Sequence, residues 1–295
     1  MNIEKLAEKY RKLIKERMAP HNITTAHDEK GHWYVKDGKK YGSVTKELQT
    51  LKDEGLMNWK MNRALEYIKD NWLEVRNTIE MPKLEAIIEQ AKLAPQQEFE
   101  GAGDIGRQVH DWREKIFSML MQGCDYNPAY ISKDMDPAVI SGCRGIEKFL
   151  QETGYIPVAC ELSLVDPEFE LGGMLDDIGI LPHPTKIKVQ HATLGEGYKI
   201  KYKPKLCLID LKTSNIGNKT SYFLQVALYA KMFIKLTGIR PQEYYILHVS
   251  KTDGSYKLIR INNITQLIKD ATLLLKLNKS LRRIDEEKKK EPIVI

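Results

Sequence analysis

The chain has 295 residues, of which 42% are hydrophobic and 29% are charged, and its net charge is +6. This composition supports a folded core of one or two domains and excludes an intrinsically disordered chain, while the small positive excess permits a polyanionic partner without requiring one. Because no run of 18 or more apolar residues occurs and the N-terminus lacks an apolar segment, we expect no membrane helix and no secretory signal, and hence a cytoplasmic protein.

Residues 1–100 predict a mainly helical region with one small β-hairpin. The hairpin is indicated by residues 32–44, where two strand-like runs flank an Asp-Gly pair that is typical of tight turns. Ser43 or Thr45 is suited to cap a following helix, which Gly55 would end. Apolar residues at spacings of three and four predict further helices over 1–20, 56–74 and 82–96.

Residues 101–295 predict a second unit in which strands follow helices. Two helices are expected over 104–123 and 138–153, with a loop containing Asn-Pro and Asp-Pro between them. After Gly154 the chain turns to short apolar and β-branched runs, which predict strands over 155–165, 170–181, 205–213, 243–250 and 255–261. Helical periodicity returns over 221–238 and again from about residue 263, where the helix is expected to fray in DEEKKKEP. This order predicts an α/β or α+β core behind a helical N-terminal region.

Acidic residues recur inside these apolar strands. Asp210 and Lys212 lie two residues apart in LCLIDLKTS, so both project to one face of a strand. A buried ion pair needs a reason, because removing two charges from water can cost more than their attraction returns. The two preceding strands bring Glu161 and the pair Asp176-Asp177 into similar apolar surroundings. Repeated burial of acids indicates a cation that collects them, and carboxylates with waters are what Mg²⁺ binds. The alternative is a strand end where each charge finds another partner.

These segments resemble the PD-(D/E)XK nuclease superfamily and its RecB-like exonuclease branch. The resemblance rests on GGMLDDIGIL, LCLIDLKTS and YFLQVALYA, which match an Asp after a Gly, an Asp-x-Lys and a Gln-x-x-x-Tyr in that order. Upstream, GDIGRQVHDWREKI resembles a family helix whose Gly and His face the metal. The resemblance covers roughly 100–235, and the stretch 206–230 is particularly similar to phage-encoded and mitochondrial genome-maintenance exonucleases. The matching positions are His110, Asp176, Asp210, Lys212, Gln225 and Tyr229.

The resemblance implies a restriction-endonuclease-like central mixed β-sheet flanked by helices, and a metal-dependent deoxyribonuclease. It assigns to Mg²⁺ or Mn²⁺ the side chains of Asp176, Asp210 and His110 and the main-chain carbonyl of Leu211. Lys212 would position or activate the attacking water, and Glu161 would orient a second metal ion or a water. Asp176 and Asp177 face opposite sides of a strand, and the Gly-x-x-Asp spacing from Gly173 favours Asp176 as the ligand.

The segment 183–205 carries six lysines and one glutamate, with two tyrosines interleaved. It predicts a basic hairpin inserted between the catalytic strands, since lysines with aromatic residues hold single strands without reading sequence. A solvated hairpin whose lysines protect its edge is the alternative. Together with the helix residues implied by the resemblance, the expected DNA contacts are Gln225, Tyr229, Lys199, Lys201 and Lys203.

The four cysteines contain no CxxC pair, and the last one, Cys207, precedes the Gln-Tyr helix. Several RecB-like nucleases carry a group of cluster-binding cysteines after that helix, so no iron–sulfur cluster is expected here. We expect a DNA exonuclease, encoded by a phage or a cell, that acts in replication, recombination or repair. Its substrate would be single-stranded DNA or the end of a duplex, and replication or recombination proteins are further expected partners, with no membrane involved.

Three other interpretations stay open. A CRISPR-type adaptation nuclease would share this core, but the missing cysteine group argues against it. A catalytically silent nuclease fold that binds DNA or serves as a scaffold would have no reason to keep the Asp176, Asp210 and Lys212 set. A restriction-type endonuclease would be expected to bring a target-reading domain, which we do not identify in the sequence. Oligomeric state and strand polarity are not indicated by the pattern.

Overall fold

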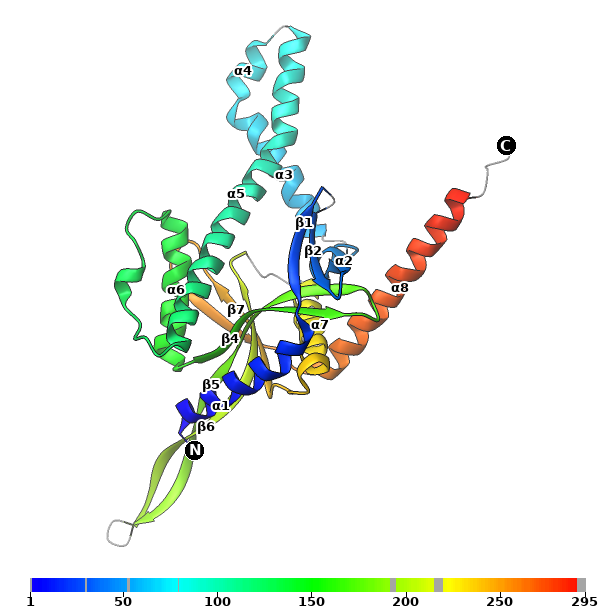
Figure 1. The fold of residues 1–295 in the computed structure, drawn as a ribbon. Helices are drawn as coiled ribbons and strands as arrows, with labels where there is room; N and C mark the ends of the chain where they lie inside the picture. Colours follow the sequence, from blue (N-terminus) through cyan, green and yellow to red (C-terminus); the bar gives the residue numbers. More distant parts are fainter. Residues whose placement is uncertain are drawn as a thin grey trace.

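An open mixed β-sheet with helices on both faces forms the body of the protein (Figure 1). The structure is a computed structural model, and it describes residues 2–29, 31–51, 54–78, 80–191, 195–214 and 220–290. The predicted α/β fold class is confirmed at this level. In the described part of the chain, no helix is long and apolar enough to cross a membrane.

The centre of the sheet is an antiparallel meander followed by a parallel crossover. Strands β4 (Ile156–Asp166), β5 (Leu171–His191) and β6 (Gly195–Lys212) pair antiparallel in turn. Helix α7 (Thr220–Thr237) then crosses over to β7 (Glu243–Val249), which pairs parallel with β6, and β8 (Tyr256–Arg260) returns antiparallel. A parallel pair requires such a crossover connection. All five predicted strands are therefore present.

The two middle strands are longer than predicted, because they continue into the expected basic hairpin. Their outer ladder runs from Pro182 paired with Pro204 to His191 paired with Gly195. The hairpin predicted over 183–205 is therefore confirmed in its backbone. The side chains of 184–191 and 195–202 lie outside the described residues.

A small N-terminal sheet joins the start of β5. β2 (Gly31–Lys36) and β3 (Lys39–Ser43) form the predicted hairpin, with positive φ at both turn residues, and β1 (Thr24–Asp28) adds a strand that we did not predict. Ser43 caps α2 (Val44–Leu48) as expected, by accepting a hydrogen bond from the Lys46 N–H. The expected end of this helix is wrong, because α2 stops at Leu48 and Gly55 lies inside α3 (Glu54–Asp70).

Helix α5 (Met81–Met121) replaces the two helices that we predicted over 82–96 and 104–123. The gap that we predicted between them contains Gly101 and Gly103, which each cost a helix only about 1 kcal/mol, and tertiary packing overrides this cost. The N-terminal half of α5 packs against α3, and α4 (Trp72–Asn77) lies between these two helices in the sequence. The three helices form an arm that projects from the body (Figure 1). The domain boundary that we placed at residue 100 falls within α5.

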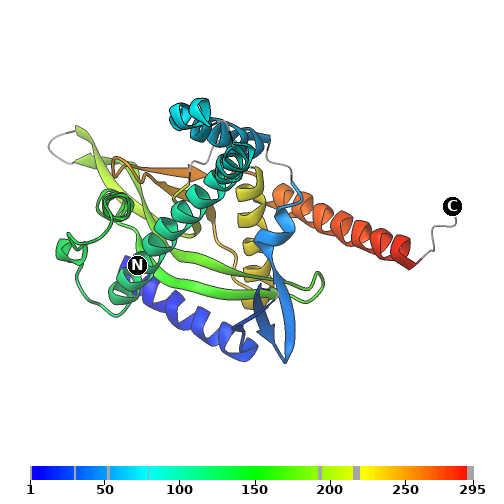
Figure 2. The same ribbon diagram turned by 90° about the horizontal axis from the view of Figure 1, so that it is seen from above.

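Each face of the sheet has its own hydrophobic core. One face packs against α1 (Ile3–Met18), α7 and the start of α8 (Ile264–Lys290), and the other packs against the second half of α5 and α6 (Pro137–Thr153). The last helix does not fray where we expected it to, because α8 continues through the charged run to Lys290. Figure 2 shows it extending away from the body.

We expect Gly173→Ala to destabilise the fold, because a Cβ at this position in β5 would lie 2.5 Å from Cε1 of the buried Tyr229 ring. Overpacking of this kind costs about 1–3 kcal/mol. The matched control is Gly101→Ala in α5, where a Cβ would meet nothing within 4 Å and should stabilise the helix by about 0.5–1 kcal/mol. Urea denaturation measures both, and equal free energies of unfolding for the two variants would contradict the packing argument.

Candidate metal centre

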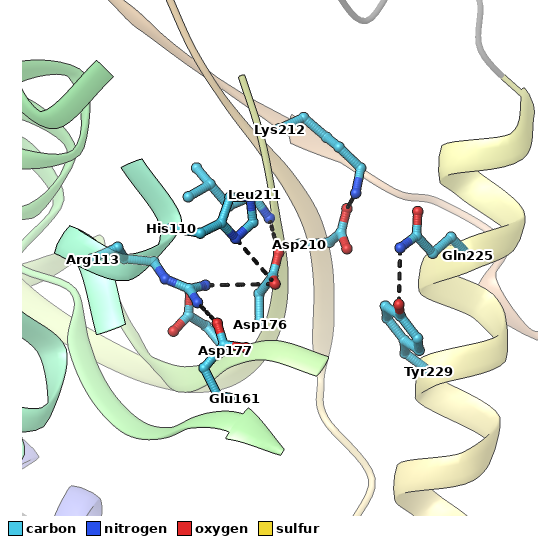
Figure 3. Close-up of polar contacts among 10 residues, drawn as sticks. All are labelled: His110, Arg113, Glu161, Asp176, Asp177, Asp210, Leu211, Lys212, Gln225 and Tyr229. Carbon is cyan, nitrogen blue, oxygen red and sulfur yellow. Dashed lines mark hydrogen bonds and ion pairs between the residues drawn. The ribbon is translucent and has the colours of Figure 1, made fainter. Parts of the chain in front are cut away.

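The acids of three neighbouring strands meet where β5 and β6 part. The last pair of the β5–β6 ladder at this end is Asp177 with Ile209. Asp176 and Asp210 are the residues that follow this pair on the two strands, so they lie next to one another. The β4–β5 ladder skips Glu161, which lies opposite Asp176 on the other side of β5. Residues opposite one another in antiparallel strands share a face. The strands thus gather the three carboxylates that the sequence singled out (Figure 3).

Glu161 has an unusual backbone conformation for a residue inside a strand. Its φ is 51°, in the left-handed region that side chains other than glycine rarely adopt. Such a position interrupts the ladder like a bulge and re-aims the side chain, and strained residues of this kind cluster at functional sites. Here the interruption turns the Glu161 carboxylate toward α5 rather than leaving it at the edge of the sheet.

Helix α5 brings an imidazole to these carboxylates. Gly106 lies one turn before His110, and a Cβ on Gly106 would come within 2.9 Å of the Thr213 hydroxyl oxygen, just beyond β6. The glycine therefore allows the helix to approach the end of β6 closely. His110 lies with its Nδ1 3.5 Å from Oδ1 of Asp176. The predicted placement of a Gly and a His on the face toward the acids agrees with this geometry.

A buried arginine connects all of these elements. Arg113 has no exposed surface, and its guanidinium donates to Asp177 at 2.8 Å and to Glu161, and lies 3.8 Å from Asp176. A fully buried guanidinium is costly unless carboxylates pair with it. Arg113 therefore ties α5 to β4 and β5 at the same point.

Our sequence interpretation missed Arg113. The only signal was its position three residues after His110, which puts both residues on one helical face. Glu114, the next residue, lies on the surface. Asp177, which we did not favour as the ligand, is 1% exposed and accepts from Arg113 at 2.8 Å.

Three donor groups lie close enough to share one cation. Ligand atoms of His110, Glu161 and Asp176 all lie within 4.8 Å of one another. Asp210 lies beside this group, and its Oδ1 is buried without a hydrogen-bond partner in the described part of the chain. A carboxylate oxygen left in this way costs free energy unless something compensates it.

Lys212 faces Asp210 on the same side of β6, as its spacing predicts. Its Nζ lies 2.7 Å from Asp210 Oδ2 and 5.0 Å from the centre of the Tyr222 ring. Leu211, between them, donates its N–H to Asp176 Oδ2 at 2.6 Å. Because the N–H and C=O of a strand residue point to the same edge, the Leu211 carbonyl also points toward β5, which is compatible with its predicted role.

Gln225 and Tyr229 form a pair on α7 beside this site. Gln225 Nε2 donates to the Tyr229 hydroxyl at 2.9 Å, and Tyr229 is only 4% exposed because its ring packs over Gly173. Burial suits Tyr229 to fix the site rather than to touch DNA, and Gln225 is the more exposed of the two. Lys203 is exposed on β6, and the side chains of Lys199 and Lys201 lie outside the described residues.

Burial and neighbouring negative charges raise the pKa values of most acids in this cluster. Burial raises the pKa of Glu161 to about 7 and that of Asp177 to about 7, although Arg113 opposes both shifts. Burial also raises the pKa of Asp210 to about 6 against the attraction of Lys212, with Asp176 adding to the shift. The pKa of Asp176 alone is held well below its usual range, because His110 and Arg113 outweigh the effect of burial.

The pKa values of the two bases, His110 and Lys212, are raised, whereas burial alone would lower them. Burial lowers the pKa of His110 and Lys212, but neighbouring carboxylates outweigh it, so both pKa values are raised. In the Asp210–Lys212 pair both partners therefore shift upward, since burial and Asp176 act on the carboxylate more strongly than its lysine does. Lys212 stays protonated at neutral pH.

Comparisons with known proteins leave the family open. No protein-family model matches the chain, and no curated protein matches it. A solved structure described as "Crystal structure of SSO0001" shows 12% sequence identity over 92% of this chain and 86% of that chain, with a TM-score of 0.24.

We expect the metal-free protein to lose thermal stability as the pH rises from about 5 to 8. The raised pKa values of Glu161, Asp177 and Asp210 mean that the folded state holds protons that the unfolded chain has released, so their contribution is lost as the pH rises through about 6–7. Added Mn²⁺ or Mg²⁺ should stabilise more at pH 8 than at pH 5.5, because ligands bind metal deprotonated. Differential scanning calorimetry with EDTA or metal measures this, and a metal effect that is equal at both pH values would contradict it.

Replacing Arg113 with methionine should cost about 3–5 kcal/mol of folding free energy, because Glu161 and Asp177 would be left buried without their cation. Arg107→Met on the exposed face of the same helix is the matched control and should change stability by less than about 0.5 kcal/mol. Adding Asp177→Asn to Arg113→Met should recover part of the loss. Equal denaturation midpoints for the two single variants would rule out this role for Arg113.

Proposed function

We propose that the chain is a metal-dependent deoxyribonuclease with a RecB-like PD-(D/E)XK core. The observation that carries this proposal is the convergence of His110, Glu161 and Asp176 donor atoms within 4.8 Å, beside the buried Asp210–Lys212 pair. The antiparallel meander that leads through a crossover helix to a parallel strand supports the restriction-endonuclease-like sheet that the sequence predicts.

The charge balance of the described cluster favours a divalent cation in addition to Arg113. Four carboxylates face two permanent cations, Arg113 and Lys212, and one imidazole. The arginine pairs with Glu161 and Asp177 and the lysine with Asp210, so negative charge remains in excess. Oxygen donors with one imidazole suit Mg²⁺ and still better Mn²⁺. The residues that would hold the ion are Asp176, Asp210, His110 and the Leu211 carbonyl, with Glu161 at its side.

A divalent cation bound there would supply Lewis acidity at a phosphate oxygen and acidify the attacking water. Lys212, kept protonated by Asp210 and Asp176, would hold that water or the phosphate by donating hydrogen bonds, and would offset the negative charge that develops on the phosphate. Glu161, whose carboxylate lies within 4.8 Å of the donor atoms of His110 and Asp176, would be placed to orient that water or to accept its proton. Gln225 and Tyr229 would keep the Asp210 side of the site in place.

The substrate that we propose is DNA, with exonuclease action in replication, recombination or repair as the use of the activity. The basic hairpin at 183–205, including Lys199, Lys201 and Lys203, would add phosphate contacts. Such contacts would raise affinity uniformly across sequences and make binding sensitive to salt.

The test is cleavage of end-labelled linear and circular DNA in Mg²⁺ or Mn²⁺. Asp176→Asn, Asp210→Asn and Lys212→Gln keep side-chain size and should each lower the rate at least about 100-fold, as expected for groups that act on the transition state. Lys269→Gln, at an exposed position of α8 outside both the cluster and the hairpin, should keep the rate within a few-fold.

Loss of linear DNA with circles spared would support an exonuclease, whereas cleaved circles would make the activity an endonuclease. Circular dichroism of each variant separates lost chemistry from lost folding. If the folded wild-type protein binds DNA tightly and with strong salt dependence but cleaves neither form in any metal, the catalytic proposal fails and the chain acts as a DNA-binding module.

A further inference from the structure

A groove of about 820 Å³ lies against the candidate metal centre, between α1 and β4. Six consecutive residues of β4, 158–163, form its floor. Helix α1 and the turn after it form one wall, and Met121 at the end of α5 lines it as well. Among the described strands, β4 pairs only with β5, so the other edge of β4 is free to face the groove.

Glu161 belongs to both the groove and the site. It lines the groove as part of β4, and its carboxylate lies within 4.8 Å of the donor atoms of His110 and Asp176. The left-handed backbone at Glu161 is what lets one residue of the floor reach the cluster. A ligand lying along β4 therefore meets the candidate metal centre at this residue.

The groove combines cations with apolar surface. Arg11 is held in place by donating from Nε and Nη2 to the Pro157 carbonyl, at 3.3 and 3.0 Å. Lys15, one turn further on, is exposed and forms no ion pair within the described part of the chain. Apolar side chains, Met18 and Leu162 among them, cover much of the remaining lining, and Asn22 and Ser163 add neutral polar groups. Glu161 is the one acid that lines the groove in the described residues.

A single nucleic-acid strand has the matching chemistry, since its phosphates pair with cations and its bases present flat apolar faces. The volume also sets a limit. Pockets of roughly 300–1,000 Å³ hold ligands of drug size, which matches a short stretch of one strand better than the larger cross-section of a duplex.

We propose that this groove binds the single-stranded end of a DNA substrate and delivers it to the site at Glu161. The inference rests on the proposed function and deepens it, because it assigns the route and the strandedness of the substrate. Arg11 and Lys15 contact phosphates, the methionines and aliphatic side chains contact bases, and a duplex must open before its end can enter.

The test compares Lys15→Glu with Lys12→Glu, a matched charge reversal on the same helix at a side chain that is 80% exposed and does not line the groove. Fluorescence anisotropy in EDTA measures the affinity of each for a labelled oligothymidylate and for a blunt duplex. Lys15→Glu should weaken single-strand binding about tenfold and lower the salt slope by about one, whereas Lys12→Glu should leave both close to wild type. Ser163→Trp, which fills the groove, should weaken binding without changing any charge.

Cleavage kinetics in the presence of a divalent metal ion distinguish the groove proposal from the nuclease proposal. If wild type cleaves and Lys15→Glu raises KM for the oligothymidylate about tenfold with kcat retained, the groove is the route of the substrate. If wild type cleaves and the two charge reversals behave alike, the groove proposal fails and the nuclease proposal stands. If the wild-type protein does not cleave DNA in any metal, the nuclease proposal fails. A loss of single-strand affinity in Lys15→Glu but not in Lys12→Glu would still support the groove as a binding site.

Discussion

The contact on which the rest of the site depends is the one that Arg113 makes with Glu161 and Asp177. The fully buried guanidinium joins α5 to Glu161 on β4, which is 48 residues away in the sequence, and to Asp177 on β5, which is 64 residues away. Removing such a charge from water is tolerable only with carboxylates in contact, and the carboxylates in turn are tolerable only with the guanidinium present. The position of α5 over the sheet, and therefore of His110 over Asp176, is fixed by this mutual requirement.

The same arrangement explains how a buried cluster of four acids can be stable without a bound metal ion. Arg113 and Lys212 compensate part of the negative charge, which lets four acids share one buried region of the protein. They do not compensate all of it, as the raised pKa values of Glu161 and Asp210 indicate. Such a balance allows the cluster to fold without a metal ion, and the cation that we propose would stabilise it further. The contact with Arg113 and the catalytic role that we propose make opposite demands on Glu161, because its carboxylate is already bound to a guanidinium.

Local sequence patterns predicted much of this structure. They failed where contacts between distant parts of the chain determine the conformation. The Asp-Gly turn, the Ser43 cap and Gly154 act within a few residues, so their effects were predictable. The continuity of α5 was not, because packing against α3 and the sheet outweighs the helix-breaking tendency of its glycines.

The candidate site shows the same division. Asp176, Asp210 and Lys212 were predicted because strand periodicity and motif order carry that information. Arg113 was missed because nothing near it in the sequence reveals that its partners lie on two strands. The buried position of Tyr229 likewise depends on a glycine of β5 that is remote in sequence.

The long ladder between β5 and β6 has a consequence for how this chain can change. Asp176 and Asp210 meet because every pair out to His191 and Gly195 keeps one register. Since side chains alternate between faces, a slip of one residue would turn one acid away from the other. The projecting hairpin can therefore lengthen or shorten in evolution by matched pairs, or with a bulge that absorbs an odd residue. Without such a bulge, a single-residue insertion far out in the hairpin would change how Asp176 and Asp210 face one another.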